Sequence, residues 1–154
     1  MANAEQRYGT SRFSVPKNWV DNSMINFVGP PTGSARPSLV ITNRSLPGNP
    51  SLESFAKNQK AALLEANLPG FELLDEGPVI HGDRKFFRLS FTWLGTQQEE
   101  GSEAAQPLRQ EQYYLLGTGR ALTLTLSCAP DAFDKMAPVF SDMIQNTFLD
   151  EGKE

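Results

Sequence analysis

The sequence has very few of the side chains that usually carry catalysis or hold a metal. Its 154 residues include one histidine, His81, and one cysteine, Cys128. Neither Cys-x-x-Cys nor His-x-x-x-His spacing occurs, which argues against the common metal sites. No Gly-x-Ser-x-Gly turn is present, and the segment Gly117-Thr118-Gly119 precedes a strand pattern, which favours a hairpin turn over a phosphate-binding loop. We therefore expect no enzymatic activity, no cofactor and no metal.

Runs of positive charge and long apolar runs are also missing. The chain has 14 basic and 18 acidic residues, a net charge of −4, which argues against a nucleic-acid partner or an anionic membrane bound by charge. The longest apolar runs are far shorter than the ~20 residues of a membrane span, so we expect no direct membrane insertion. The first seven residues lack the apolar stretch of a signal peptide, and the lone cysteine forms no intrachain disulfide. Both features predict a cytoplasmic protein.

What the sequence does contain is a pattern of short strands. Hydrophobic residues make up 39% of the chain, and its length suits one globular domain over residues 1–154, with an ordered core of about 7–149. The segment 121–128 alternates without a fault, with Leu122, Leu124, Leu126 and Cys128 on one face. A core thiol is the favoured interpretation of Cys128. Alternation or apolar enrichment predicts strands over residues 8–15 (broken near Gly9), 24–28, 38–43, 71–79, 85–94, 108–116 and 121–128.

Two segments have helical spacing instead. Ser51 is a good N-cap for a helix that ends near Leu68-Pro69-Gly70. After Pro130-Asp131, the apolar residues predict a short turn up to about Met136 and a main helix that starts at Pro138. The fold class predicted is α+β, with a mostly antiparallel sheet of about six to seven strands and two main helices.

Three features remain open at this level. The pair His81 and Asp83 lies in a predicted turn, where a solvated turn is favoured over half of a hydrolytic triad. The polar segment 95–106 is favoured as a solvated connection over a binding loop. Gln59 lies on the apolar stripe of the first helix, and Gln110 shares a strand face with Gln112. A glutamine amide both donates and accepts hydrogen bonds, so these side chains fit either a binding surface or a sheet face that is simply exposed to solvent.

The order of short motifs resembles a known family. The motifs are Arg12 to Ser23, Ile25-Asn26-Phe27, Ser54 to Leu63, Leu108 to Gln112 and Phe140 to Phe148. Their order and spacing over about residues 7–149 are similar to the DcrB-related family, which has a PsbP-like α/β sandwich fold and includes the Eag chaperones of bacterial type VI secretion.

The resemblance implies a function without catalysis. It implies a homodimeric cytoplasmic chaperone that binds the N-terminal transmembrane segments of a PAAR-containing toxin effector, shields them from water and aids their loading on the secretion spike. It leaves open whether Gln110 or Gln112 faces the bound segment. The groove residues that it implies are Ile25, Phe27, Val40, Gln59, Ala62, Leu63, Ala66, Gln110 and Gln112.

The physical chemistry of such a role is consistent. An apolar helix in water exposes a surface whose burial is worth roughly 25 cal/mol per Å², and helix-in-groove binding is a known recognition mode. The alternative is a generic PsbP-like protein–protein adaptor or an envelope-stress factor that binds no effector. A hydrolase that uses His81 and Asp83 is a more distant alternative.

Overall fold

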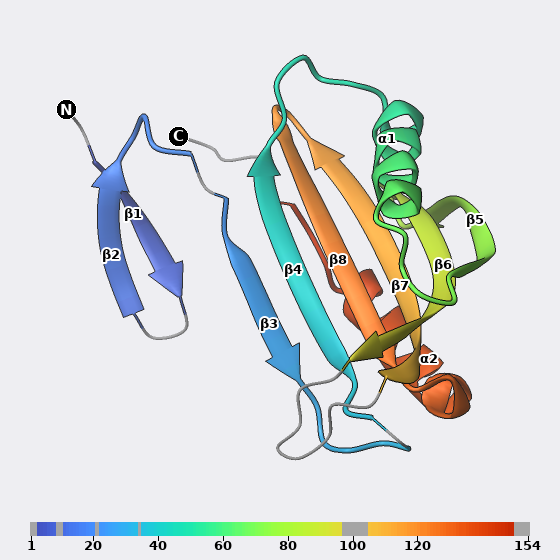
Figure 1. The fold of residues 1–154 in the computed structure, drawn as a ribbon. Coiled ribbons are helices and arrows are strands. Elements are labelled where there is room, and N and C mark those ends of the chain that lie inside the picture. Colours follow the sequence, from blue (N-terminus) through green and yellow to red (C-terminus); the bar gives the residue numbers. More distant parts are fainter. Residues whose placement is uncertain (1–2, 9–10, 21, 34, 97–104, 150–154) are drawn as a thin grey trace.

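The computed structural model describes residues 3–8, 11–20, 22–33, 35–96 and 105–149. Figure 1 shows two helices and a long twisted sheet, with a small strand pair at one side. The strands are β1 (Asn3–Tyr8), β2 (Ser11–Pro16), β3 (Met24–Val28), β4 (Ser38–Ser45), β5 (Glu72–His81), β6 (Arg84–Thr96), β7 (Ala105–Gly117) and β8 (Arg120–Cys128). The helices are α1 (Leu52–Glu65), the short 3₁₀ turn η1 (Pro130–Ala132) and α2 (Phe133–Gln145).

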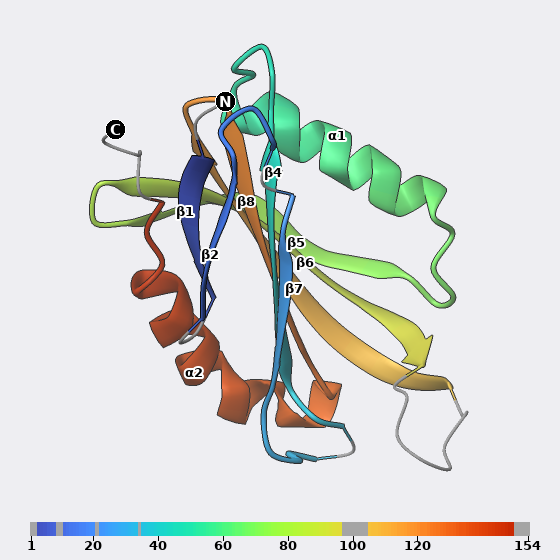
Figure 2. The same cartoon turned by 90° about the vertical axis from the view of Figure 1, so that its left-hand side faces the viewer.

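The main sheet has six strands in the order β3-β4-β8-β7-β6-β5. Each neighbouring pair is antiparallel. The sheet separates the two helices, so that α1 lies on one face and α2 on the other (Figure 2). The predicted α+β class with a mostly antiparallel sheet is therefore confirmed.

Helix α1 forms where its caps predict. The Ser51 hydroxyl accepts a hydrogen bond from the Ser54 amide at 3.1 Å, which satisfies one of the free N–H groups of the first turn. The helix ends before Asn67 and Gly70, which have φ of 50° and 65°, because such left-handed backbone cannot continue a right-handed helix. Its buried residues belong to a core cluster with the sheet: Phe55, Ala56, Leu89, Phe91, Tyr114 and Ala121.

Helix α2 runs without a break through Pro138, so the predicted start of the main helix at Pro138 is wrong. Proline removes one backbone hydrogen bond and crowds the preceding turn, at a cost of about 3 kcal/mol. Met136, Phe140 and Ile144 are all buried and recur every four residues, so burial of one continuous apolar stripe offsets that cost. The stripe packs on Leu124, Leu126 and Cys128 of β8. The core position predicted for Cys128 is thus confirmed.

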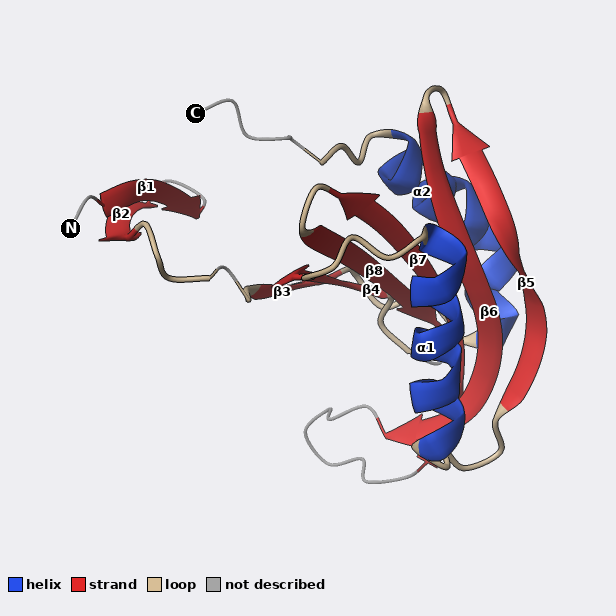
Figure 3. Cartoon of the chain, turned by 90° about the horizontal axis from the view of Figure 1, so that it is seen from above, coloured by secondary structure: helices blue, strands red, loops and turns tan. Residues whose placement is uncertain are grey.

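The N-terminal region differs from the prediction. The single strand predicted over residues 8–15 is in fact a hairpin, in which β1 pairs with β2 from Asn3↔Pro16 to Tyr8↔Ser11. The turn at residues 9–10, which includes the predicted break at Gly9, lies outside the described residues. The hairpin forms a sheet of its own and stands apart from the six-stranded sheet in Figures 1 and 3.

The other hairpins agree with the turn residues. The turn between β5 and β6 is formed by Gly82, whose φ is 64°, and Asp83, while His81 is the last residue of β5, so the turn predicted there is confirmed. The turn between β7 and β8 contains Thr118 and Gly119, whose φ is 67°. Of the connection predicted at 95–106, residues 97–104 lie outside the described residues, while β6 and β7 extend into both of its ends.

Candidate binding surface

The sheet register places Val40 and Gln112 on one face. Val40 lies directly opposite Thr125, and Thr125 lies directly opposite Gln112 on its other side. Side chains directly opposite one another share a face. Tyr114 is two residues from Gln112 and packs in the α1-side core, so this is the face that α1 covers in part. We call the uncovered part the open face, and its residues are Met24, Asn26, Val40, Thr42, Thr123, Thr125, Gln110 and Gln112.

Helix α1 covers only one end of this face. It packs over β6 and β7, while β8, β4 and β3 continue beyond it (Figure 3). Two contacts define the rotation of α1 about its own axis. The Lys60 ammonium lies 2.8 Å from the Glu76 carboxylate of β5, and the Arg44 guanidinium of β4 lies 5.2 Å from the centre of the Phe55 ring. One flank of α1 therefore faces β5 and the opposite flank faces β4.

The residues of α1 that were predicted for the site lie either on the flank that faces β4 or on the side that faces the core. Successive residues are about 100° apart around a helix, so Ala62 and Ala66 share the flank of Phe55, toward β4. Gln59 lies between that flank and the core and is half-buried. Leu63 packs against the α1-side core. The structure thus brings Gln59, Ala62 and Ala66 to the border of the open face.

The two glutamines of β7 are both on the open face but differ in their hydrogen bonds. Gln110 accepts from the indole N–H of Trp93 at 2.7 Å and donates to the Ser127 hydroxyl at 2.7 Å. Gln112 accepts from the Tyr114 hydroxyl, while its NH₂ group has no partner among the described residues. Gln112, and not Gln110, therefore has an amide donor free for a ligand.

Ile25 and Phe27 do not lie on this face. Ile25 is directly opposite Ile41 and Phe27 is directly opposite Leu39, and Leu39 packs against the α2-side core. Within one chain these two residues therefore lie on the other side of the sheet from Val40, Gln59 and Gln112. The spacing of residues 24–28 shows that alternate residues share a face, but it does not tell which face meets which helix.

Phe27 belongs instead to a separate groove, which we call the edge groove. It lies between β3, the following loop and α2, has a volume of about 450 Å³ and is almost wholly apolar. Phe27 is 55% exposed there, although its ring is large and apolar. The residues that line the edge groove are Phe27, Val28, Gly29, Pro30, Thr32, Pro37, Ser38, Leu39, Met136, Val139, Phe140 and Met143.

A buried ionic cluster lies on the α2 side of β6 and β7, and the sequence analysis did not find it. The Glu111 carboxylate is 3% exposed and lies 3.2 Å from Arg109 and 3.9 Å from Arg88. Burial lowers the pKa of Arg88, but the charge of Glu111, together with Tyr113 and the charge of Asp75, more than offsets this, and the net shift of the pKa is upward. Arg109 also stacks on the Phe133 ring at 3.7 Å. An acidic residue within the alternation of 108–116 is the one signal that could have indicated the cluster.

Two residues considered for catalysis, His81 and Cys128, pack against other parts of the chain. The His81 ring packs edge-on against Phe86, with 5.8 Å between ring centres. Burial raises the pKa of the Cys128 thiol to about 11, which keeps it in the poorly nucleophilic protonated form. In the parts of the chain that the structure describes, no three His, Cys, Asp or Glu residues gather as a metal site would require. None of the helices in those parts is long and apolar enough to cross a bilayer.

Comparisons with known proteins identify the family and the fold. The sequence model of the family described as DcrB matches residues 11–146. A comparison with curated proteins finds no match. A crystal structure of PA94 from Pseudomonas aeruginosa, described as a protein of unknown function and putative regulator, is similar with a TM-score of 0.75 and 22% identity, over 97% of this chain and 99% of that chain.

Two further solved structures share the fold at lower similarity. The cyanobacterial PsbP (CyanoP) from Synechocystis sp. PCC 6803 has a TM-score of 0.50 and 14% identity, over 91% of this chain and 89% of that chain. LpqN of Mycobacterium tuberculosis, described as involved in cell envelope biogenesis, has a TM-score of 0.52 and 15% identity, over 83% of this chain and 80% of that chain. The PsbP-like fold expected from the sequence is therefore confirmed.

Proposed function

We propose that this chain, which belongs to the DcrB family, is a chaperone for the N-terminal transmembrane segments of a PAAR-containing type VI secretion effector. In this proposal it has no catalytic role and no cofactor, it acts in the cytoplasm, and its partner is an apolar helix of another protein. The resemblance of its motifs to the Eag chaperones supports the effector as partner, and the open face supports the kind of ligand.

The observation that carries the proposal is the chemistry of the open face. Val40 and the alanines of the neighbouring α1 flank offer apolar contact, and Thr123 and Thr125 add methyl groups. Among the described residues, neither the amide donor of Gln112 nor the side chain of Gln59 has a hydrogen-bond partner. A transmembrane helix placed on this face would bury apolar surface at roughly 25 cal/mol per Å². The amides would pair with its small hydroxyls or exposed carbonyls, which a wholly apolar face would leave unsatisfied.

The proposed site differs in one respect from the groove that the resemblance implied. It retains Val40, Gln59, Ala62, Ala66 and Gln112 as direct contacts. Leu63 and Gln110 support the site from within, because Leu63 packs on the core and both polar groups of Gln110 are already paired. Ile25 and Phe27 lie on the other side of the sheet and are not part of the site within one chain.

Co-expression with the N-terminal apolar segment of an effector tests the proposal. The segment should be insoluble alone and should co-purify with the wild-type chain. Val40→Asp and Gln59→Ala should each weaken the complex at least about tenfold, because about 1.4 kcal/mol of lost contact corresponds to a factor of ten. Ile80→Asp is the matched control, since Ile80 is exposed on the distant edge strand β5.

Three outcomes would overturn the proposal. The segment stays insoluble beside the wild-type chain, or the complex survives both Val40→Asp and Gln59→Ala, or Ile80→Asp weakens it equally. Circular dichroism of each variant must match the wild type, so that loss of binding is not loss of fold. Capture of a wholly water-soluble partner, with no binding of the apolar segment, would favour the alternative role as a generic adaptor.

A further inference from the structure

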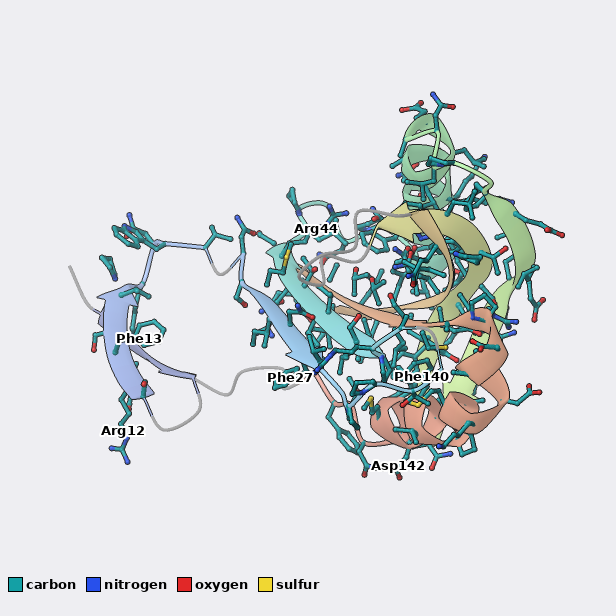
Figure 4. The ribbon with its side chains drawn as sticks, turned by 60° about the horizontal axis from the view of Figure 1, so that its bottom comes forward. Arg12, Phe13, Phe27, Arg44, Phe140 and Asp142 are labelled. Atoms are coloured by element: carbon teal, nitrogen blue, oxygen red, sulfur yellow. The ribbon has the colours of Figure 1, made fainter. Side chains whose placement is uncertain are left out.

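Arg44 is a charged residue at one end of the open face. The residues that define the open face are all uncharged. Val40, Thr42 and Arg44 lie on the same side of β4, since alternate residues of a strand share a face, and Arg44 lies directly opposite Ala121 of the α1-side core. Figure 4 shows Arg44 on the side of the main body away from Phe140 of α2. A ligand on the open face therefore meets a cation where β4 ends.

The Arg44 guanidinium has no carboxylate partner among the described residues. Its side chain is exposed and lies over the Phe55 ring, 5.2 Å from the ring centre, and no described acidic side chain is within ion-pair distance of it. Glu53 of the same helical turn shares the flank of Lys60, which faces β5, and pairs with Lys85 at 2.6 Å. The planar fork of N–H donors on Arg44 is therefore available to a ligand.

This cation limits how an apolar helix can lie on the open face. An apolar part of the helix placed over Arg44 would take the charge out of water without a partner, which is costly. The last turn of a helix avoids this cost, because its final carbonyls lack intrahelical partners and its C-terminal end carries a partial negative charge. The first turn instead presents N–H groups and a partial positive charge, which Arg44 repels. Arg44 therefore favours one end of the helix over the other.

The length of the strand agrees with one helix end at Arg44. The 8 residues of β4 extend over about 27 Å, whereas a membrane-spanning helix of ~20 residues is about 30 Å long. With one end at Arg44, such a helix covers the whole of β4, and its other end projects beyond the start of the strand. A helix moved further along, so that its apolar part covers Arg44, would leave part of the open face uncovered.

We infer that the apolar segment binds with its C-terminal end at Arg44 and runs in the same direction as β4, and that Arg44 selects segments with an acidic residue just after the apolar stretch. The inference rests on the proposed function, to which it adds the direction of the bound helix and the charge of its flank. Arg44 determines the direction, whereas Val40, Gln59 and Gln112 contact the segment whichever way it runs. A carboxylate after the apolar stretch meets the guanidinium as an ion pair, in addition to the final carbonyls of the helix.

Competition between segments with different flanks tests the direction. The segments share an apolar stretch of about 20 leucines and alanines, fused through a flexible linker to a soluble carrier protein, and carry either aspartates or lysines at the C-terminal or the N-terminal flank. Two segments are co-expressed with a limiting amount of the chain, and mass spectrometry gives their ratio in the purified complex. The wild type should prefer aspartates to lysines at the C-terminal flank by about fivefold, and Arg44→Glu should reverse this preference. The ratio for the N-terminal flank should be the same in both proteins.

Lys57→Glu is the matched control, because it makes the same change of charge at an exposed residue on the outer side of α1. It should keep the wild-type preference. The direction is overturned, and the proposed function left standing, if Arg44→Glu alters the ratio for the N-terminal flank, alters neither ratio, or acts no differently from Lys57→Glu. If no segment binds the wild-type chain, the proposed function fails and the direction with it. Should Arg44→Glu unfold by circular dichroism, Arg44→Gln replaces it and should abolish the preference instead of reversing it.

Discussion

Val40 and Gln112 lie on one face of the sheet, separated only by Thr125, although they come from opposite halves of the chain. The antiparallel insertion of β8 between β4 and β7 creates this relationship. It joins an apolar side chain to a free amide donor on a surface that α1 leaves uncovered. The proposed binding of an apolar helix depends on this pairing.

The hydrogen bond between Tyr114 and Gln112 should show coupling in a double-mutant cycle. Tyr114 is fully buried and its hydroxyl donates to Gln112. Gln112→Leu leaves that hydroxyl without an acceptor and should lower the free energy of unfolding by about 1–3 kcal/mol. In a Tyr114→Phe background the same substitution should cost about 1 kcal/mol less. Urea denaturation of the four proteins measures the difference, and strictly additive effects would contradict the bond.

Arg84 should stabilise the C-terminus of α2. Its guanidinium donates to the carbonyl of Gln145 at 2.8 Å and to that of Thr147, and it stacks on the Phe148 ring at 3.9 Å. A cation that pairs with the free carbonyls of the last turn also opposes the negative end of the helix dipole. Arg84→Ala should therefore lower the free energy of unfolding by about 2 kcal/mol.

Arg84→Lys is the control for charge alone, because lysine keeps the cation but lacks the planar fork that meets several carbonyls. It should recover only part of the lost stability in the same denaturation measurement. Full recovery would mean that the charge matters and the fork does not. No loss in Arg84→Ala would show that α2 needs no such cap.

The buried carboxylate of Glu111 should be costly to neutralise. Glu111→Gln keeps the shape of the side chain but removes the buried counter-charge of Arg109 and Arg88, and of these two only Arg88 keeps another carboxylate partner, the exposed Asp75. Breaking a buried ion pair from one side costs about 3–5 kcal/mol, so a large fall in the urea midpoint is expected. Glu53→Gln removes an exposed carboxylate that pairs with Lys85 and should change the midpoint little. Equal effects of the two substitutions would contradict the burial of this cluster.

The thiol of Cys128 should make the stability depend on pH above neutrality. Burial raises its pKa from the ordinary value of 9.0 to about 11 in the folded chain. The stabilisation is therefore complete below about pH 9 and is lost as the pH rises toward about 11, because only the unfolded chain ionises easily in that range. Compared with Cys128→Ala, the wild type should lose additional stability over this interval. Parallel pH profiles of the two proteins in urea denaturation would contradict the prediction.

The sequence by itself determined the local elements. Ser51 and Pro69-Gly70 bound the first helix, and the alternation at 121–128 specifies β8 and the buried Cys128, because caps, turns and a two-residue period act between near neighbours. The order of the motifs indicated the family and its fold. Two local predictions failed. A single proline was outweighed by the apolar stripe of α2, and the N-terminal strand proved to be a hairpin.

Only the tertiary structure decided which faces meet. Residues 24–28 alternate in the same way whether Ile25 and Phe27 point toward α1 or toward α2, and their register with β4 made that choice. The ionic cluster around Glu111, the free amide of Gln112 and the vacant edge groove also arise from pairings between distant segments. A one-residue change in the register of a strand would move each of its side chains to the opposite face of the sheet. The sequence of one strand does not specify its register with the neighbouring strand, so only the tertiary structure decides the face.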